Sequence, residues 1–167
     1  DGRAAGAAEP LTALASDLPG VDRLAVLPAG FAVGALAAGI KASGRPDLSV
    51  VRTSAGPAAT AAVFTQHPFA AAPVRLSQAN LRASAAAGDG GYGWAEAIVA
   101  TSGCANAATG LPGRADQEEV GRLLSVAAGL PADRILHLST GIIGSRLPLA
   151  AIGSGLAALV PAGLSET

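Results

Sequence analysis

The fold class can be inferred from residues 95–138, AEAIVATSGCANAATGLPGRADQEEVGRLLSVAAGLPADRILHL. Apolar runs at Ala95–Ala100 and Arg134–Leu138 predict two strands, and the stretch Ala115–Ala128 between them predicts a helix. Strands that alternate with helices are typical of a sheet covered by helices. The sequence therefore predicts an α/β layered domain.

The helix expected over Ala115–Ala128 is amphipathic and has a clear end. Apolar residues repeat at i, i+3, i+4 and i+7, namely Val120, Leu123, Leu124 and Ala127. Gly129 followed by Pro131 predicts where the helix stops. We place Asp116, Glu118 and Glu119 in the first turn, where the helix dipole favours anions, and interpret them as a helix start rather than an acid/base pair.

The rest of the chain extends this pattern. Further strands are expected at Phe31–Ile40, Leu48–Val51 and Thr60–Phe64, and further helices at Pro73–Ala87, with Val74, Leu81 and Ala85 on one face, and at Leu149–Val160. Residues 1–20 predict a flexible leader, so that 21–167 form one domain. The chain has no methionine and begins at Asp1, from which we expect a processed or trimmed product.

Composition excludes several classes of protein. Half of the 167 residues are apolar and the net charge is −1, which argues against disorder. Eleven basic residues balance twelve acidic ones without forming a run, so no nucleic-acid surface is expected. The uncharged stretches Leu24–Ile40 and Leu147–Ser165 are interrupted by Pro and Gly, and we predict no membrane span. One cysteine and two histidines out of ligand spacing predict no metal site, and a reducing, cytoplasmic setting.

Isolated chemical motifs are weak in this sequence. Gly88–Gly93 matches G-x-G-x-x-G, but a helix is expected before it and a strand after it, so we interpret it as a surface turn. Cys104 is either a nucleophile or a small buried hydrophobe, and the second is the more common role. We expect His67 in a loop and His137 packed within a strand. Ser102 lacks the G-x-S-x-G elbow.

A set of segments occurs in the order and spacing of one family. They are GIKASGRPDL at 39–48, VFT at 63–65, AAPV at 71–74, SGCANAATG at 102–110, STGIIG at 139–144 and LP at 147–148. From about Val21 to its end, the chain resembles the N-terminal (α) portion of the ornithine acetyltransferase family. This family is also called the glutamate N-acetyltransferase family and consists of bifunctional arginine-biosynthesis enzymes.

The resemblance implies a self-processing acetyltransferase. Its precursor cuts itself once, and the new N-terminal threonine of the second (β) chain becomes the nucleophile; that threonine and the expected substrate-binding residues lie beyond Thr167. The implied fold is a layered α/β/β/α sandwich completed by the β chain, with two αβ units associating into a heterotetramer. A ping-pong reaction through an acetyl-enzyme would carry acetyl from N-acetylornithine to glutamate with no metal or organic cofactor.

Thr109 and Gly110 match the family's Thr-Gly oxyanion hole and are the catalytic residues that the resemblance implies. A threonine hydroxyl and the N–H of a glycine can both donate to an oxyanion, and glycine has no Cβ to block approach. On residue types alone, a helix N-cap at Thr109 is the alternative interpretation.

The sequence also departs from the family pattern, and this leaves alternatives open. The usual NSGNANACTG run reads TSGCANAATG at 101–110. Residues 65–70, TQHPFA, replace a more polar, Lys-containing run, and 88–94 resembles an insertion. A divergent paralogue, acting as an N-acyltransferase or amide hydrolase in specialised metabolism, is the second hypothesis. A non-enzymatic binding or scaffold fragment is the third.

Overall fold

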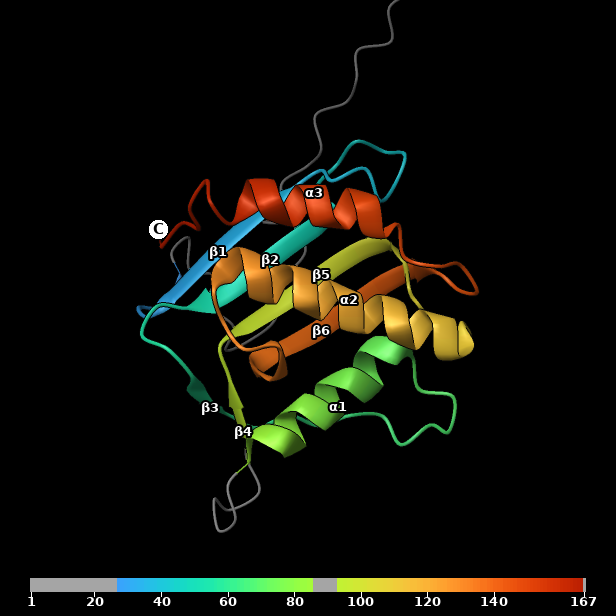
Figure 1. The fold of residues 1–167 in the computed structure, drawn as a ribbon, viewed down its shortest axis with the longest axis horizontal. Coiled ribbons are helices and arrows are strands. Elements are labelled where there is room, and N and C mark those ends of the chain that lie inside the picture. Colours follow the sequence, from blue (N-terminus) through green and yellow to red (C-terminus); the bar gives the residue numbers. More distant parts are fainter. Residues whose placement is uncertain (1–26, 86–92, 167) are drawn as a thin grey trace, which may run out of the picture.

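A four-stranded sheet forms the centre of the molecule in the computed structural model, which describes residues 27–85 and 93–166 (Figure 1). Its strand order is β1 (Phe31–Leu36), β2 (Leu48–Thr53), β5 (Ala97–Cys104) and β6 (Ile135–Ile142). β2 is antiparallel to both β1 and β5, whereas β5 and β6 are parallel and are joined through a helix. The predicted α/β class is confirmed.

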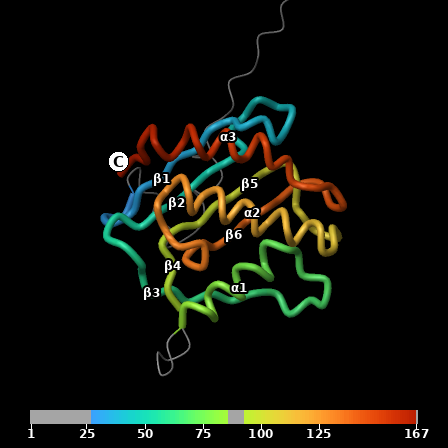
Figure 2. Tube along the Cα trace, in the orientation of Figure 1, coloured from blue at the N-terminus to red at the C-terminus, as the bar shows by residue number. Residues whose placement is uncertain are grey.

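Three helices lie against one face of this sheet (Figure 2). They are α1 (Ala72–Ser84), beside β6; α2 (Gly110–Ala128), in the middle; and α3 (Leu149–Leu159), across β1 and β2. A short 3-10 turn, η2 (Ala132–Arg134), precedes β6, and β3 (Ala58–Thr60) pairs with β4 (Gly93–Ala95) as a separate small sheet. Within the described residues, no helix is both long and apolar enough to cross a membrane.

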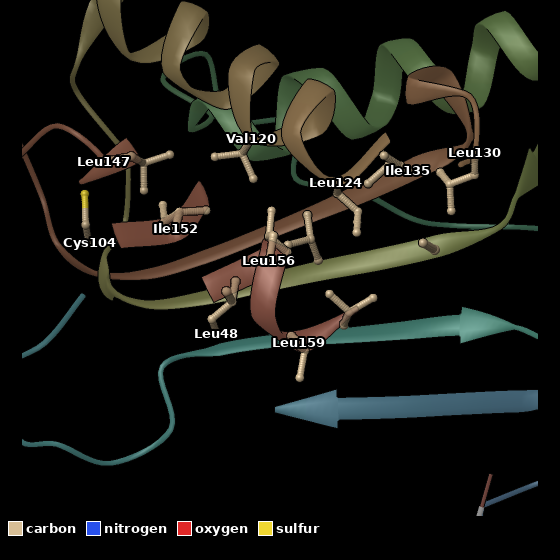
Figure 3. Packing of buried hydrophobic residues seen from close by; sticks show 13 residues of the cluster. Leu48, Cys104, Val120, Leu124, Leu130, Ile135, Leu147, Ile152, Leu156 and Leu159 are labelled. Carbon is tan, nitrogen blue, oxygen red and sulfur yellow. The ribbon is translucent and has the colours of Figure 1, made fainter. Parts of the chain in front are cut away.

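The hydrophobic core fills the space between the sheet and helices α2 and α3 (Figure 3). Alternate residues of β2 and β5 point into it, as expected for strands with one covered face: Leu48, Val50, Ala97 and Val99. Helix residues Val120, Leu124, Ile152 and Leu156 meet them from the other side. Cys104 is buried among these residues, in the role of a small hydrophobe.

Helix α2 begins five residues before the predicted start. It runs from Gly110 rather than Ala115, so Asp116, Glu118 and Glu119 lie inside the helix and the prediction of a first-turn acidic cluster is wrong. The reason is tertiary, because the Asp116 side chain is buried and forms a bidentate ion pair with Arg146, 30 residues further along the chain. The predicted end is confirmed: Gly129 closes the helix with φ of 65°.

Two other expectations are corrected. The third strand covers Ala58–Thr60 instead of Thr60–Phe64, and Val63 is 99% exposed. In α1, Val74 is only half-buried, and the buried face includes Ser77, Asn80 and Ser84. Polar residues can occupy that face because they bond the neighbouring backbone; Asn80 donates to the carbonyl of Ile135 at 2.8 Å. The expected leader 1–20 and most of the turn Gly88–Gly93 lie outside the described residues.

Candidate active site

Thr109 and Gly110 lie where the loop after β5 turns into helix α2. The turn is sharp because three residues adopt left-handed backbone angles: Asn106 (φ 48°), Ala108 (φ 56°) and Gly110 (φ 61°). Glycine adopts this conformation without steric cost, and asparagine does so more readily than most residues. Gly110 is the first residue of α2 and is exposed, so its N–H has no partner within the helix.

The Thr109 side chain occupies the N-cap position but does not cap the helix. Its hydroxyl instead donates to Oδ1 of Asn106 at 2.7 Å. Asn106 is completely buried, and its amide nitrogen donates to the carbonyl of Gly113 at 2.8 Å and to Oε1 of Gln117 at 3.1 Å. The Thr109 hydroxyl therefore bonds the buried amide of Asn106 and does not accept a hydrogen bond from the free N–H groups at the start of the helix.

Gly113 allows this arrangement because it has no side chain. A Cβ at this position would overlap the Thr109 hydroxyl and the Asn106 amide oxygen. Glycine at 113, one helical turn after Thr109, is thus required by close packing rather than by its backbone angles.

The buried polar contacts continue from Gln117 to the sheet. Its Nε2 lies 3.1 Å from Nδ1 of His137 on β6, and the hydroxyl of Ser139 approaches its Oε1 at 3.4 Å. Burial lowers the pKa of His137 to about 4, so that the imidazole is neutral at pH 7. The expectation of a packed His137 is confirmed, and its partners are polar.

Loops from three parts of the chain converge around Thr109. The N–H of Ala72, at the start of α1, bonds the carbonyl of Asn106 at 3.3 Å, and the N–H of Gly144 bonds the carbonyl of Ala107 at 2.9 Å. The thiol of Cys104 donates to the carbonyl of Ser145 at 3.1 Å. Three of the segments quoted above, 71–74, 102–110 and 139–144, are thereby brought together.

A pocket of about 900 Å³ opens beside this junction. Asn106, Ala108, Thr109 and Gly110 form one wall, and α1 forms another. It is also lined by three arginines, Arg75, Arg82 and Arg114, of which Arg114 pairs with Glu118 at 2.9 Å. Guanidinium groups can bind carboxylate-bearing molecules.

The other candidate residues lie elsewhere. His67 is exposed in a loop, as expected, and its Nδ1 accepts from the N–H of Phe69 at 3.1 Å. Ser102 is half-buried and its hydroxyl lies 3.4 Å from Nζ of Lys41. Cys104 is only 4% exposed and bonds Ser145, which fits the structural role of this residue. Among residues 27–85 and 93–166, no group of three or more His, Cys, Asp or Glu side chains could hold a metal ion.

Comparison with known proteins decides the family. A family model described as "ArgJ family" matches residues 32–166. The chain belongs to the ArgJ family. The arginine biosynthesis bifunctional protein ArgJ, mitochondrial, of Penicillium rubens is 42% identical over 127 residues, which are 75% of this chain and 25% of that protein. The ArgJ protein of Synechococcus is 40% identical over 140 residues, 81% of this chain and 32% of that protein.

Solved ArgJ-family structures share the fold. Ornithine acetyltransferase of Mycobacterium tuberculosis, in complex with ornithine, matches with a TM-score of 0.75 and 35% identity over 84% of this chain and 70% of that chain. ArgJ of Bacillus halodurans matches with a TM-score of 0.71 and 29% identity over 83% and 66%. The resemblance drawn from the sequence segments is confirmed. The chain spans about a quarter to a third of the length of the curated relatives.

Sequence reasoning missed the residues beneath Thr109. Asn106 stood in the quoted segment without an assigned role, Gln117 was overlooked, and no polar partner was predicted for His137. One signal was available: Gly113 and Gln117 interrupt the apolar pattern of the helix at i+4 spacing, on the same face as Val120.

Proposed function

We propose that this chain is the α portion of a self-processing N-acetyltransferase, in which Thr109 and Gly110 form the oxyanion hole. The observation that carries the proposal is their position on the wall of a pocket, with the Gly110 N–H free of any helical partner and the Thr109 hydroxyl beside it. Membership of the ArgJ family supports it.

The proposed reaction follows from what each group can do. An N-terminal threonine on a partner β chain attacks the acetyl carbonyl of N-acetylornithine, and its own α-amine accepts the hydroxyl proton. The carbonyl oxygen becomes an oxyanion, which accepts hydrogen bonds from the Thr109 hydroxyl and the Gly110 N–H. Ornithine leaves, and glutamate then takes the acetyl group from the threonine. This ping-pong sequence requires no metal or organic cofactor.

The open face of the sheet supports the need for a partner chain. Side chains on the face away from the helices include Ile98 and Leu138, both exposed in this chain. A second sheet packed on this face would bury them and would produce the α/β/β/α layers that the family resemblance implies. We propose that the β chain of the same precursor supplies that sheet, and that two αβ units associate.

The test is to substitute Thr109 in the enzyme assembled with its β chain. Thr109→Val keeps the shape but removes the hydroxyl, and we expect kcat for acetyl transfer from N-acetylornithine to glutamate to fall about 100- to 1000-fold, with KM changed less. Thr109→Ser, which retains a hydroxyl, is the matched control and should keep most of the activity. A wild-type kcat in Thr109→Val would rule out the oxyanion role.

A divergent specificity is the second candidate. Ala108 lines the pocket at the position where the family run carries Cys, so the pocket wall differs there. Measuring transfer from a panel of N-acyl amines would separate the two: turnover of other substrates without exchange between ornithine and glutamate would favour a paralogue. A cytoplasmic location stays a prediction, since the Penicillium relative is named mitochondrial.

A further inference from the structure

The orientation of the Asn106 amide is determined by its surroundings. The carbonyl of Gly113 can only accept a hydrogen bond, and it lies 2.8 Å from Nδ2 of Asn106. The opposite orientation of the amide would place two carbonyl oxygens in contact. Oδ1 of Asn106 therefore faces Thr109, and at 2.7 Å the Thr109 hydroxyl must be the donor.

The same reasoning determines the hydrogen bonds farther from the pocket. Nδ2 of Asn106 also faces Gln117, so Gln117 presents its Oε1 to Asn106 and its Nε2 to His137. Nδ1 of His137 must then accept, which places the imidazole proton on Nε2. The neutral state that burial imposes on His137 is consistent with this direction. The donor and the acceptor of each hydrogen bond from His137 through Gln117 and Asn106 to Thr109 are thus determined.

This arrangement has a consequence for catalysis. A hydroxyl has one proton, so Thr109 cannot donate to Asn106 and to a substrate oxygen at the same time. A neutral substrate carbonyl is an acceptor similar to the Asn106 amide, whereas a developing oxyanion is a much stronger one. The Thr109 hydroxyl, kept close to the pocket by Asn106, therefore turns its hydrogen bond from Asn106 Oδ1 to the substrate oxygen as negative charge builds up there, and the proton stays on Thr109.

We propose that Asn106 is a positioning residue for acyl transfer, which holds the Thr109 hydroxyl beside the pocket until that hydroxyl donates its hydrogen bond to the oxyanion instead. This inference rests on the proposed function, because it assigns a role to the residue beneath the proposed oxyanion hole. Gln117 contributes by fixing the amide of Asn106, and Gly113 by leaving room for the contact. No covalent step is added.

The experiment is a double-mutant cycle in the enzyme assembled with its β chain, using acetyl transfer from N-acetylornithine to glutamate. Asn106→Gly removes the amide and tolerates the left-handed backbone angle at this position. In the wild-type background we expect kcat to fall about tenfold with KM nearly unchanged, because the Thr109 hydroxyl is no longer held beside the pocket when the oxyanion forms. In the Thr109→Val background, Asn106→Gly should lower kcat by less than about twofold, because the hydroxyl it acts on is absent.

Asn80 is the matched control. It is also a buried asparagine whose amide donates to backbone carbonyls, but it bonds Ala132 and Ile135 and does not contact Thr109. Asn80→Ala should change kcat by the same factor in both backgrounds. If Asn106→Gly does not fold, Gln117→Leu replaces it in the cycle, with an expected fall of about threefold that also disappears in Thr109→Val.

The possible failures can be distinguished. If Thr109→Val keeps the wild-type kcat, the oxyanion role is wrong and the positioning role is wrong with it. If Thr109→Val lowers kcat but Asn106→Gly, or Gln117→Leu in its place, lowers it by equal factors in both backgrounds, the oxyanion role stands and the positioning role is overturned.

Discussion

Because His137 is buried between α2 and the sheet, the stability of the fold depends on the protonation of this one side chain. Its neutral imidazole bonds Gln117 through Nδ1, and Nε2 has no hydrogen-bond partner among the described residues. Gly121 packs against this edge of the ring. Protonation would place a positive charge where no acceptor and no water-exposed surface is available, which is why the pKa is low.

Stability should therefore depend on pH between about 6.5 and 4. An unfolded histidine binds a proton below about 6.5, whereas folded His137 does so only below about 4, so the unfolded state binds more protons in this window and unfolding becomes easier as pH falls. We expect the free energy of unfolding to drop by on the order of 3 kcal/mol across it. Urea titrations at several pH values measure this.

The matched variant is His137→Gln, which should flatten that dependence of stability on pH; an unchanged slope would exclude His137 as its source.

Asp47 affects stability at lower pH. Burial tends to raise its pKa, but three backbone N–H groups, at 2.7–3.0 Å, outweigh this and hold the pKa below the ordinary value of 3.8. Its contribution to stability is present above that value and is lost as pH falls through the folded pKa.

At the scale of elements, the ion pair between Asp116 and Arg146 connects helix α2 to the loop that follows β6. The Asp116 side chain is 5% exposed and that of Arg146 is 54% exposed. Loss of one partner therefore has a different cost for each residue. An unpaired Arg146 could be hydrated where it lies, whereas an unpaired Asp116 carboxylate would stay buried. The same loop carries Ile143, which lines the pocket.

Removing Arg146 should cost more than neutralising Asp116. We expect both Arg146→Ala and Asp116→Asn to lower the free energy of unfolding, and Arg146→Ala to lower it more. The double variant should be more stable than Arg146→Ala alone, since no buried charge remains. Chemical denaturation of the four proteins tests this, and equal losses in the two single variants would contradict the asymmetry.

At the scale of the whole molecule, the sheet has one covered and one open face. Cross-strand rows on the open face are largely apolar, with Val51 opposite Ile98, Ile98 opposite Leu136 and Ala100 opposite Leu138. Leu138 is 60% exposed, in the centre of β6. An apolar sheet face of this kind is typical of a surface that packs against another layer.

A charge on this face should prevent association with the proposed β chain. We expect Leu138→Glu to abolish co-purification of the two chains, because the carboxylate would be buried without a partner. Val126→Glu is the control: Val126 is 72% exposed but lies on α2, in the helix layer on the other side of the sheet. Equal recovery of the β chain with both variants would show that the open face is not the interface.

Much of the fold could be predicted from short-range patterns. The apolar runs of β5 and β6, the 3.6-residue period of α2 and its stop at Gly129 are properties of neighbouring residues, and each element appears in the structure. The errors have one kind of cause. Asp116 was assigned to the first turn of a helix, because nothing nearby in the chain shows that it would pair with Arg146. An apolar face was predicted for α1, because nothing nearby shows that the backbone of β6 would accept hydrogen bonds from polar residues such as Asn80.

The sequence by itself determined the element types, the family and the position of Thr109 and Gly110 before a helix. Only the tertiary structure decided what lies beneath them, because the local contacts of Thr109 are held in place by residues distant in the chain. Gln117 meets His137 across 20 positions, and the loop of Ala107 meets Gly144 across 37. Burial of a polar side chain is tolerated only when such partners are in place, and the periodicity of residue types along the chain does not identify those partners.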